Sequence, residues 1–308
     1  MGWIQDLRGK NVFIAGSKKN AGKTTFMNYA ARKLKDCRLA LMSIGIDGEE
    51  SDGIFANPKP RIMIEENNLF VCSENELAAS GTQYEILKAY PFRTALGRPV
   101  LARALRRGQA EISGPENNSQ LAGLIADARE HGAETVFVDG AADRITHSAT
   151  IGNAVLAYVA RIEPENISSA ISSLNILAAS SECELWNDGE PAKACSIRLP
   201  GAVTESRAER AVSEYFASLR KTGMALPENA IPGMPHARRP ALIADNPACI
   251  FLSWQAWRRL AAKCDIFFLS KTSSILLIIN LYNVDKADFE RRFCSAGKCK
   301  VIYNPYAG

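Results

Sequence analysis

The sequence predicts an α/β fold, in which a mostly parallel sheet is flanked by helices. Apolar runs of strand length alternate with segments of helical periodicity along the chain. The length of 308 residues suits one large α/β domain or two modest ones. Hydrophobic residues make up 47% of the chain and charged residues 23%, which is typical of a globular protein and excludes a disordered or collagen-like one.

Six segments have the length and composition of buried strands. They are Asn11–Ala15, Leu39–Ile44, Pro99–Ala104, Thr135–Val138, Ala154–Ala160 and Ser196–Leu199. Between the second and third of these, residues 61–72 predict a β-hairpin insertion, with Asn67 and Asn68 supplying the turn.

Two segments between the strands have helical spacing. One contains Leu121, Leu124 and Ile125 and stops at His131-Gly132, where the histidine reads as a helix-end residue and not as a catalyst. The other runs from Thr204, its expected cap, to Arg220, with Gly223 as its end.

The composition changes after the second helix, because four prolines fall within residues 223–240. The sequence therefore predicts a core domain over 1–222, a proline-rich linker over 223–240 and a small α/β C-terminal subdomain over 241–308. The subdomain's expected elements are Cys249–Leu252, Trp254–Lys263, Asp265–Leu269, Ile275–Asn280 and Lys300–Tyr303.

Charge and hydropathy argue against nucleic acid and membrane as partners. A net charge of +4 is small for this length and gives no reason to propose nucleic acid. The longest apolar run, Ile275–Ile279, is far shorter than the roughly 20 residues that span a bilayer, and no signal peptide is recognised, so no membrane association and a cytoplasmic location are expected. Eight cysteines without a C-x-x-C pair predict mostly buried thiols and no zinc site.

The strongest functional signal is "GSKKNAGKTT", residues 16–25, which lies between an apolar strand and a helical pattern. A phosphate loop needs backbone amides that converge on the oxygens, a lysine for the phosphate charge and a hydroxyl for Mg²⁺. Lys23 and Thr24 supply the last two, and Gly22 lets the backbone approach. The first glycine of the usual pattern falls on Ser17, a small residue that still fits. The expected nucleotide-binding residues are Gly16, Ser17, Lys18, Lys19, Asn20, Ala21, Gly22, Lys23, Thr24 and Thr25.

A carboxylate follows a second buried strand. Asp139 ends the run Thr135–Val138, which is where an acid that orients Mg²⁺ through water is expected. Asp143 and Arg144 come shortly afterwards and either report the γ-phosphate or form a structural ion pair.

The pattern K-x-x-x-G-K-T-T beginning at Lys18 resembles the deviant loop of the SIMIBI class of P-loop NTPases, which includes the MinD/Mrp ATPases and dethiobiotin synthetase. The resemblance implies a homodimer in which Lys18 reaches the neighbouring subunit's phosphates. The loop is also similar to that of molybdopterin-guanine dinucleotide accessory proteins, which leaves the choice between Lys18 and Lys19 open. The class carries a switch aspartate where this chain has Asp47, which implies a magnesium or water-positioning role, with Glu49, Glu50 and Asp52 as weaker candidates.

Several stretches resemble a narrower family. They are "SIGIDGEESD" at 43–52, "KPRI" at 59–62, "SGPENNSQL" at 113–121, "VFVDGAADR" at 136–144, "LPGAVTE" at 199–205 and "IFLS" at 250–253. They are similar to the P-loop subunit of the reactivating factor for the B12-dependent lysine 5,6-aminomutase. That resemblance implies the aminomutase and a second reactivase subunit as partner proteins.

The expected function is Mg²⁺-dependent binding and hydrolysis of a nucleoside triphosphate as a conformational switch, with Lys23, Asp47 and Lys18 in catalytic roles and Thr24, Asp47 and Asp139 around the metal. Two alternatives stay open: a small-molecule ligase or kinase of the dethiobiotin synthetase type, and a nucleotide-binding module without hydrolysis. ATP is the expected nucleotide. GTP is not excluded, because Asp285-Lys286-Ala287-Asp288 approaches the guanine motif.

Overall fold

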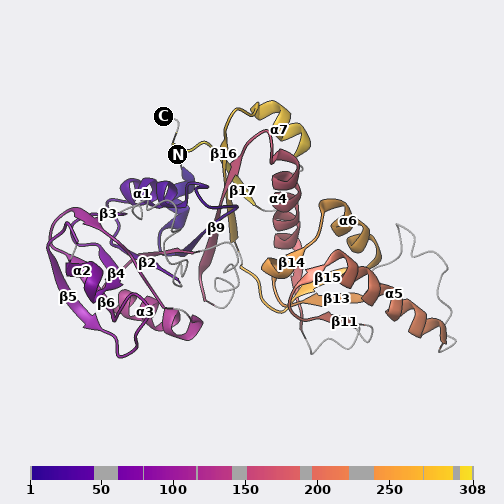
Figure 1. The fold of residues 1–308 in the computed structure, drawn as a ribbon, viewed down its shortest axis with the longest axis horizontal. Helices are drawn as coiled ribbons and strands as arrows, with labels where there is room; N and C mark the ends of the chain where they lie inside the picture. Colours follow the sequence, from indigo (N-terminus) through magenta and orange to yellow (C-terminus); the bar gives the residue numbers. More distant parts are fainter. Residues whose placement is uncertain are drawn as a thin grey trace. The chain divides into compact units, whose positions relative to one another are not determined.

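The computed structural model describes residues 2–44, 62–78, 80–115, 117–140, 151–187, 196–221, 239–272, 274–293 and 299–306. The chain divides into two compact units (Figure 1). Unit 1 contains residues 1–161, 276–280 and 301–308, and unit 2 contains residues 162–275 and 281–300.

A nine-stranded sheet is the centre of unit 1, with the strand order β17-β16-β9-β1-β8-β2-β4-β6-β5. The pairs from β9 to β4 are parallel, and β6 and β5 add antiparallel strands at one edge. The strands are β1 (Asn11–Gly16), β2 (Leu39–Ser43), β4 (Leu69–Ser73), β5 (Tyr84–Ala89), β6 (Pro99–Ala104), β8 (Thr135–Asp139), β9 (Ala154–Ile162), β16 (Ser274–Leu281) and β17 (Lys300–Tyr303). The predicted α/β fold with a mostly parallel sheet is confirmed.

Helices flank the sheet of unit 1. They are the 3-10 helix η1 (Gly2–Leu7), α1 (Lys23–Lys33), α2 (Glu74–Ala78) and α3 (Asn118–Glu130). From β1, the chain passes through α1 to β2, toward the β5 edge of the sheet. From the strands near that edge, it later returns through α3 to β8, in the opposite direction. Because such crossovers are right-handed, α1 and α3 cover opposite faces.

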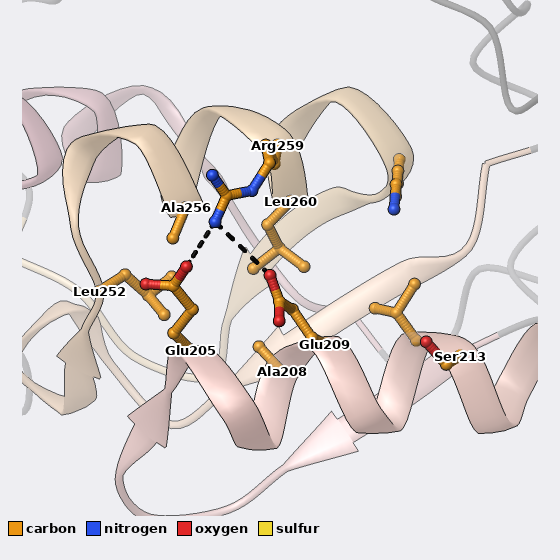
Figure 2. Close-up of a pocket in the computed structure, with 10 residues that line it drawn as sticks. Glu205, Ala208, Glu209, Ser213, Leu252, Ala256, Arg259 and Leu260 are labelled. Atoms are coloured by element: carbon orange, nitrogen blue, oxygen red, sulfur yellow. Dashed lines mark hydrogen bonds and ion pairs between the residues drawn. The ribbon is translucent and has the colours of Figure 1, made fainter.

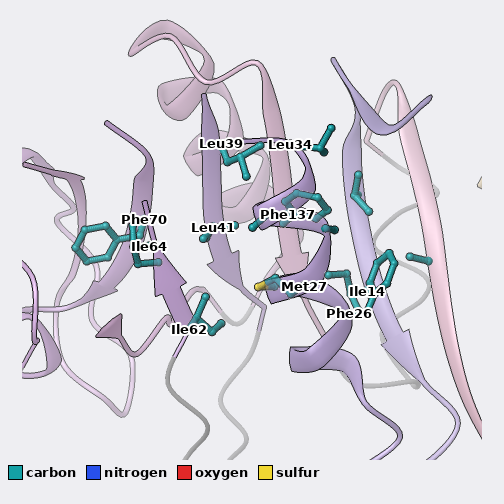
Figure 3. Packing of buried hydrophobic residues seen from close by; sticks show 14 of the residues in the cluster. Ile14, Phe26, Met27, Leu34, Leu39, Leu41, Ile62, Ile64, Phe70 and Phe137 are labelled. Carbon is teal, nitrogen blue, oxygen red and sulfur yellow. The ribbon is translucent and has the colours of Figure 1, made fainter. Parts of the chain in front are cut away.

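The face under α1 carries the main apolar core of unit 1 (Figure 3). Phe26 and Met27 of α1 pack on Ile14, Leu41 and Phe137 of the central strands, and all five side chains are nearly inaccessible to water. Burying each such side chain stabilises the fold by about 1.5–3 kcal/mol. This core holds the beginning of α1 against the ends of the central strands.

The predicted hairpin over residues 61–72 is wrong. β3 (Ile62–Ile64) pairs with β7 (Gly108–Ala110), while β4 lies between β2 and β6 in the large sheet. All five residues of β4 are buried, which suits an interior strand. A turn does occur at Asn67, which has a φ of 66°.

Unit 2 has its own parallel sheet, with the strand order β10-β15-β13-β11. Its strands are β10 (Glu184–Leu185), β11 (Ser196–Leu199), β13 (Ala241–Ala244) and β15 (Asp265–Phe268), and a short pair is formed by β12 (Val203–Thr204) and β14 (Ile250–Phe251). Its helices are α4 (Ile167–Glu182), α5 (Glu205–Lys221), η5 (Pro247–Cys249), α6 (Trp254–Lys263) and α7 (Lys286–Arg292). α5 and α6 share a core with the strands, to which α5 contributes Ala208 and Val212, α6 contributes Trp257, and the strands contribute Leu242 and Phe268.

These units differ from the predicted domains. β11 and α5, which the sequence assigns to the core domain, share a sheet and a core with β13 and β15 beyond the proline-rich segment. β16 and β17, which the sequence assigns to a C-terminal subdomain, join the large sheet instead. Pairing between distant strands decides the division, and local composition does not report that pairing.

Arg129 ties the end of α3 to the start of β1. Its guanidinium donates to the carbonyls of Gly9, Lys10 and Ala133 at 3.1–3.3 Å and to Asn11 Oδ1 at 2.7 Å. We expect Arg129→Met to lower the free energy of unfolding by about 2–4 kcal/mol, because several partly buried oxygens lose their donor together.

Equilibrium urea unfolding measures that change. Arg107→Met is the control, because Arg107 is 63% exposed and has an ion pair of 3.1 Å with Glu65. An exposed pair of this kind is worth at most about 1 kcal/mol. Equal effects of the two substitutions would contradict the anchoring role of Arg129.

Of the predicted thiols, Cys37, Cys72 and Cys264 are buried and Cys183, Cys249 and Cys299 are half-buried. Burial, helped by the nearby Glu76, raises the pKa of Cys72 to about 12. A raised thiol pKa stabilises the fold below the unfolded value of about 8.5, and this stabilisation is lost as pH rises toward the folded value.

Between pH 8 and pH 10, the free energy of unfolding should therefore fall by about 1–2 kcal/mol more in wild-type protein than in the Cys72→Ala variant. Urea unfolding at the two pH values measures the difference. Parallel losses in the two proteins would show that the Cys72 thiol does not contribute.

Candidate functional site

The segment between β1 and α1 forms a tight loop with an open helix end. Asn20 and Gly22 have positive φ angles of 60° and 102°. Gly22 is the N-cap of α1 and provides no side-chain cap, and the amide of Phe26 donates to the Gly22 carbonyl at 2.9 Å. The amides of Lys23, Thr24 and Thr25 precede the first intrahelical bond, so this end of α1 presents donors and the positive end of the helix dipole. Such an end is suited to an anion.

Lys23 folds back over the end of β1. A Cβ added at Gly16 would lie 3.0 Å from Lys23 Cγ, 3.1 Å from its Cδ and 3.3 Å from the Ala21 Cβ. The stem of Lys23 therefore occupies the space above Gly16, and a larger residue at position 16 would displace it. Lys23 and Thr24 are half-buried, whereas Lys18, Lys19 and Thr25 are exposed.

The loop is anchored to β9 through Ser17. The Ser17 amide donates to the Val159 carbonyl at 2.9 Å, and the Arg161 amide donates to Ser17 Oγ at 3.3 Å. The residue that replaces the first glycine of the usual pattern thus uses its hydroxyl to hold the loop against the neighbouring strand.

Asn280 of β16 is hydrogen-bonded to the loop, and the sequence does not predict this contact. Its Nδ2 donates to the Ala21 carbonyl at 3.1 Å, and its side chain is 3% exposed. The same Nδ2 would lie 3.2 Å from a Cβ added at Gly22. The only local signal for this residue is one amide at the end of the apolar run Ile275–Ile279, and 259 residues separate it from its partner.

Asp139 lies beside the loop, at the end of β8. It is in register with Ile14 of β1, two residues before Gly16, and the Gly140 amide donates to the Ile14 carbonyl at 3.0 Å. Phe137 belongs to the core under α1, so Asp139, two residues later, points to the same face. Its Oδ1 atom is buried. The structure thus brings the predicted acid to the carboxyl edge of the sheet, where α/β proteins bind ligands.

Several predicted acids lie outside the described residues. They are Asp47, Glu49, Glu50, Asp52 and Asp143, together with the basic Arg144. Within the described ranges, no group of three or more His, Cys, Asp and Glu side chains could hold a metal ion. Of the three predicted metal ligands, Thr24 and Asp139 lie within the described residues.

The segment that resembles a guanine motif begins a helix. Asp285 is the N-cap of α7, where its Oδ1 accepts from the Asp288 amide at 2.8 Å. Asp288 in turn pairs with Arg291 at 3.0 Å and Arg292 at 3.8 Å. Both carboxylates therefore have structural roles in α7.

A groove in unit 2 separates α5 from α6 (Figure 2). Arg259 spans it and pairs with Glu205 and, at 3.5 Å, with Glu209. The floor contains Ala208 and Leu260, which belong to the core of the unit. The groove lies where α5 and α6 pack against each other, and none of the predicted site residues lines it.

Comparison with known proteins gives no relative, since the chain matches no protein-family model, no curated protein and no solved structure. In the part of the chain that the structure describes, none of the helices has the length and apolar character needed to cross a membrane.

The geometry of Gly22 is testable by substitution. Gly22→Ala should lower the free energy of unfolding by about 1–3 kcal/mol, because alanine is strained at a φ of 102° and its Cβ would crowd Asn280. Thermal or urea unfolding measures the change.

Gly123→Ala is the matched control. Gly123 lies within α3, and an added Cβ there would meet nothing within 4 Å. This substitution should stabilise the protein by roughly 0.5–1 kcal/mol. An unchanged free energy of unfolding in Gly22→Ala would contradict the requirement for glycine at position 22.

Proposed function

We propose that the chain binds a Mg²⁺-nucleoside triphosphate at the loop of residues 16–25 and hydrolyses it as a conformational switch. The observation that carries the proposal is the open N-terminus of α1, with the stem of Lys23 folded over Gly16. Amides that precede the first intrahelical bond, a helix dipole and an adjacent lysine are together suited to a polyphosphate. ATP is the proposed nucleotide, with GTP as the alternative that nucleotide titration decides.

The donor set fits a magnesium ion. Mg²⁺ takes oxygen ligands, keeps several waters and is usually held by one or two carboxylates together with substrate phosphates. Thr24, at the start of α1, and Asp139, at the end of β8, supply oxygens on the same face of the sheet. Asp47 is a further proposed ligand. The ion would supply charge neutralisation on the phosphates.

Catalysis at such a site is positional and electrostatic, because phosphoryl transfer leaves a protein little covalent work. Lys23 and the loop amides stabilise the phosphate charge, and Asp47 is the proposed group that positions the attacking water. We propose that Lys18 or Lys19, both exposed on the loop, acts on the nucleotide of a second copy in a homodimer. Slow turnover that a partner accelerates is expected.

The cellular role is proposed from the sequence resemblance. An adenosylcobalamin enzyme that has lost its radical must release the damaged cofactor from a closed site. A protein that binds the open form of such an enzyme in only one nucleotide state shifts the enzyme toward opening. We propose a B12-dependent aminomutase and a second reactivase subunit as its partners.

Lys23→Ala should weaken Mg²⁺-ATP binding by about a hundredfold or more, because a charged hydrogen-bonding partner of the phosphates is lost. Isothermal titration calorimetry with Mg²⁺-ATP and Mg²⁺-GTP measures the affinity and the base preference. Lys33→Ala is the control, because Lys33 is an exposed lysine in the last turn of the same helix. Equal affinities of the two variants would refute the loop assignment.

Phosphate release separates the possible outcomes once binding is established. Release by purified protein without a metabolite supports the switch. Strict dependence on a carboxylated small molecule would replace it with a ligase of the dethiobiotin synthetase type, and tight binding without turnover would leave a nucleotide-binding module.

A further inference from the structure

Two adjacent strands, β8 and β2, change from apolar to polar side chains at the same level on the face under α1. One layer consists of Val12, Phe137 and Leu41, which are in register across β1, β8 and β2 and are all buried in the core. The next layer toward the carboxyl edge consists of Ile14, Asp139 and Ser43. Alternation along the strands directs Ser43, like Leu39 and Leu41, to the α1 face. The sequence predicts a site role for Asp139 and none for Ser43.

Ser43 is held directly beside Asp139. The two residues are register partners in neighbouring parallel strands, which lie about 5 Å apart. The Ile44 amide donates to the Asp139 carbonyl at 2.9 Å, so the pairing continues past the end of β2. Ser43 is half-buried and is two strands from β1, which leads into the loop.

The other side of Ser43 is closed by residues 113–114, part of the stretch "SGPENNSQL". The Ser43 amide donates to the Ser113 carbonyl at 3.0 Å, and the Ser113 amide donates to the Val71 carbonyl at 2.9 Å, so residue 113 bridges β2 and β4. A Cβ added at Gly114 would lie 1.6 Å from the Ser43 carbonyl oxygen, which leaves room only for glycine. The backbone of Ser43 is therefore fixed from both sides.

We propose that Ser43 is a positioning residue of the magnesium site, whose hydroxyl, together with Asp139, holds a water of the metal's coordination shell. This inference rests on the proposed nucleotide function. A hydroxyl and a carboxylate about one strand spacing apart can share one water as donor and acceptor. If Ser43 only ended the strand, its hydroxyl would have no effect on the affinity for Mg²⁺. The Mg²⁺ dependence of nucleotide binding therefore distinguishes a positioning role from a purely structural one.

The test is the Mg²⁺ concentration that gives half-maximal binding of a fluorescent ATP analogue, titrated at fixed protein, with binding in excess chelator measured in parallel. Ser43→Ala should raise that concentration about three- to tenfold, the effect of one lost hydrogen bond, and leave metal-free binding unchanged. Ser113→Ala is the control. Ser113 contacts Ser43 through its backbone carbonyl, which alanine retains, so this substitution removes a nearby hydroxyl without removing the bond to the Ser43 amide.

A second pair keeps the test decisive if Ser43→Ala does not fold. Ser43→Thr and Ser43→Val have nearly the same shape, and only threonine keeps the hydroxyl, so threonine should retain the wild-type Mg²⁺ response and valine should lose it. Equal Mg²⁺ responses with and without the hydroxyl would overturn the role of Ser43 while the proposed function stands. Failure of wild-type protein to bind the analogue at any Mg²⁺ concentration would refute the proposed function itself.

Discussion

The arrangement depends on one local constraint, the left-handed Gly22 that begins α1 without a side-chain cap. Because no side chain occupies the helix end, its first amides stay available to an anion, and the absence of a Cβ leaves room for Asn280. Gly16 does the same for the stem of Lys23. A larger residue at Gly22 would therefore crowd Asn280, and a larger residue at Gly16 would crowd Lys23.

Hydrogen bonds to strands distant in sequence anchor this loop. Ser17 is bonded to β9 and Ala21 to Asn280 of β16, so strands that are distant in sequence hold the loop on one side. The core under α1 holds the helix itself. Preorganised donors do not have to reorganise when charge arrives, which is the physical reason that a phosphate site benefits from such anchoring.

The parallel sheet explains why acid, hydroxyl and loop gather on one face. Parallel strands end at the same edge, and alternation sends every second residue to the same face. The apolar layer through Phe137 gives way to the layer containing Asp139 and Ser43, one residue pair further along. The core thus ends where the candidate site begins, with Asp139 and Ser43 at the ends of strands beside the loop.

The sequence by itself determined the α/β class, the strands that flank the loop, and the identity of Lys23, Thr24 and Asp139 as candidate residues, because these rest on local periodicity and short-range spacing. Only the tertiary structure decided the place of β4, the division into two units, and the positions of Asn280 beside the loop and of Ser43 beside Asp139. Each of these depends on which strands pair, and the energy of pairing lies in contacts between residues far apart in the chain, which no local pattern encodes.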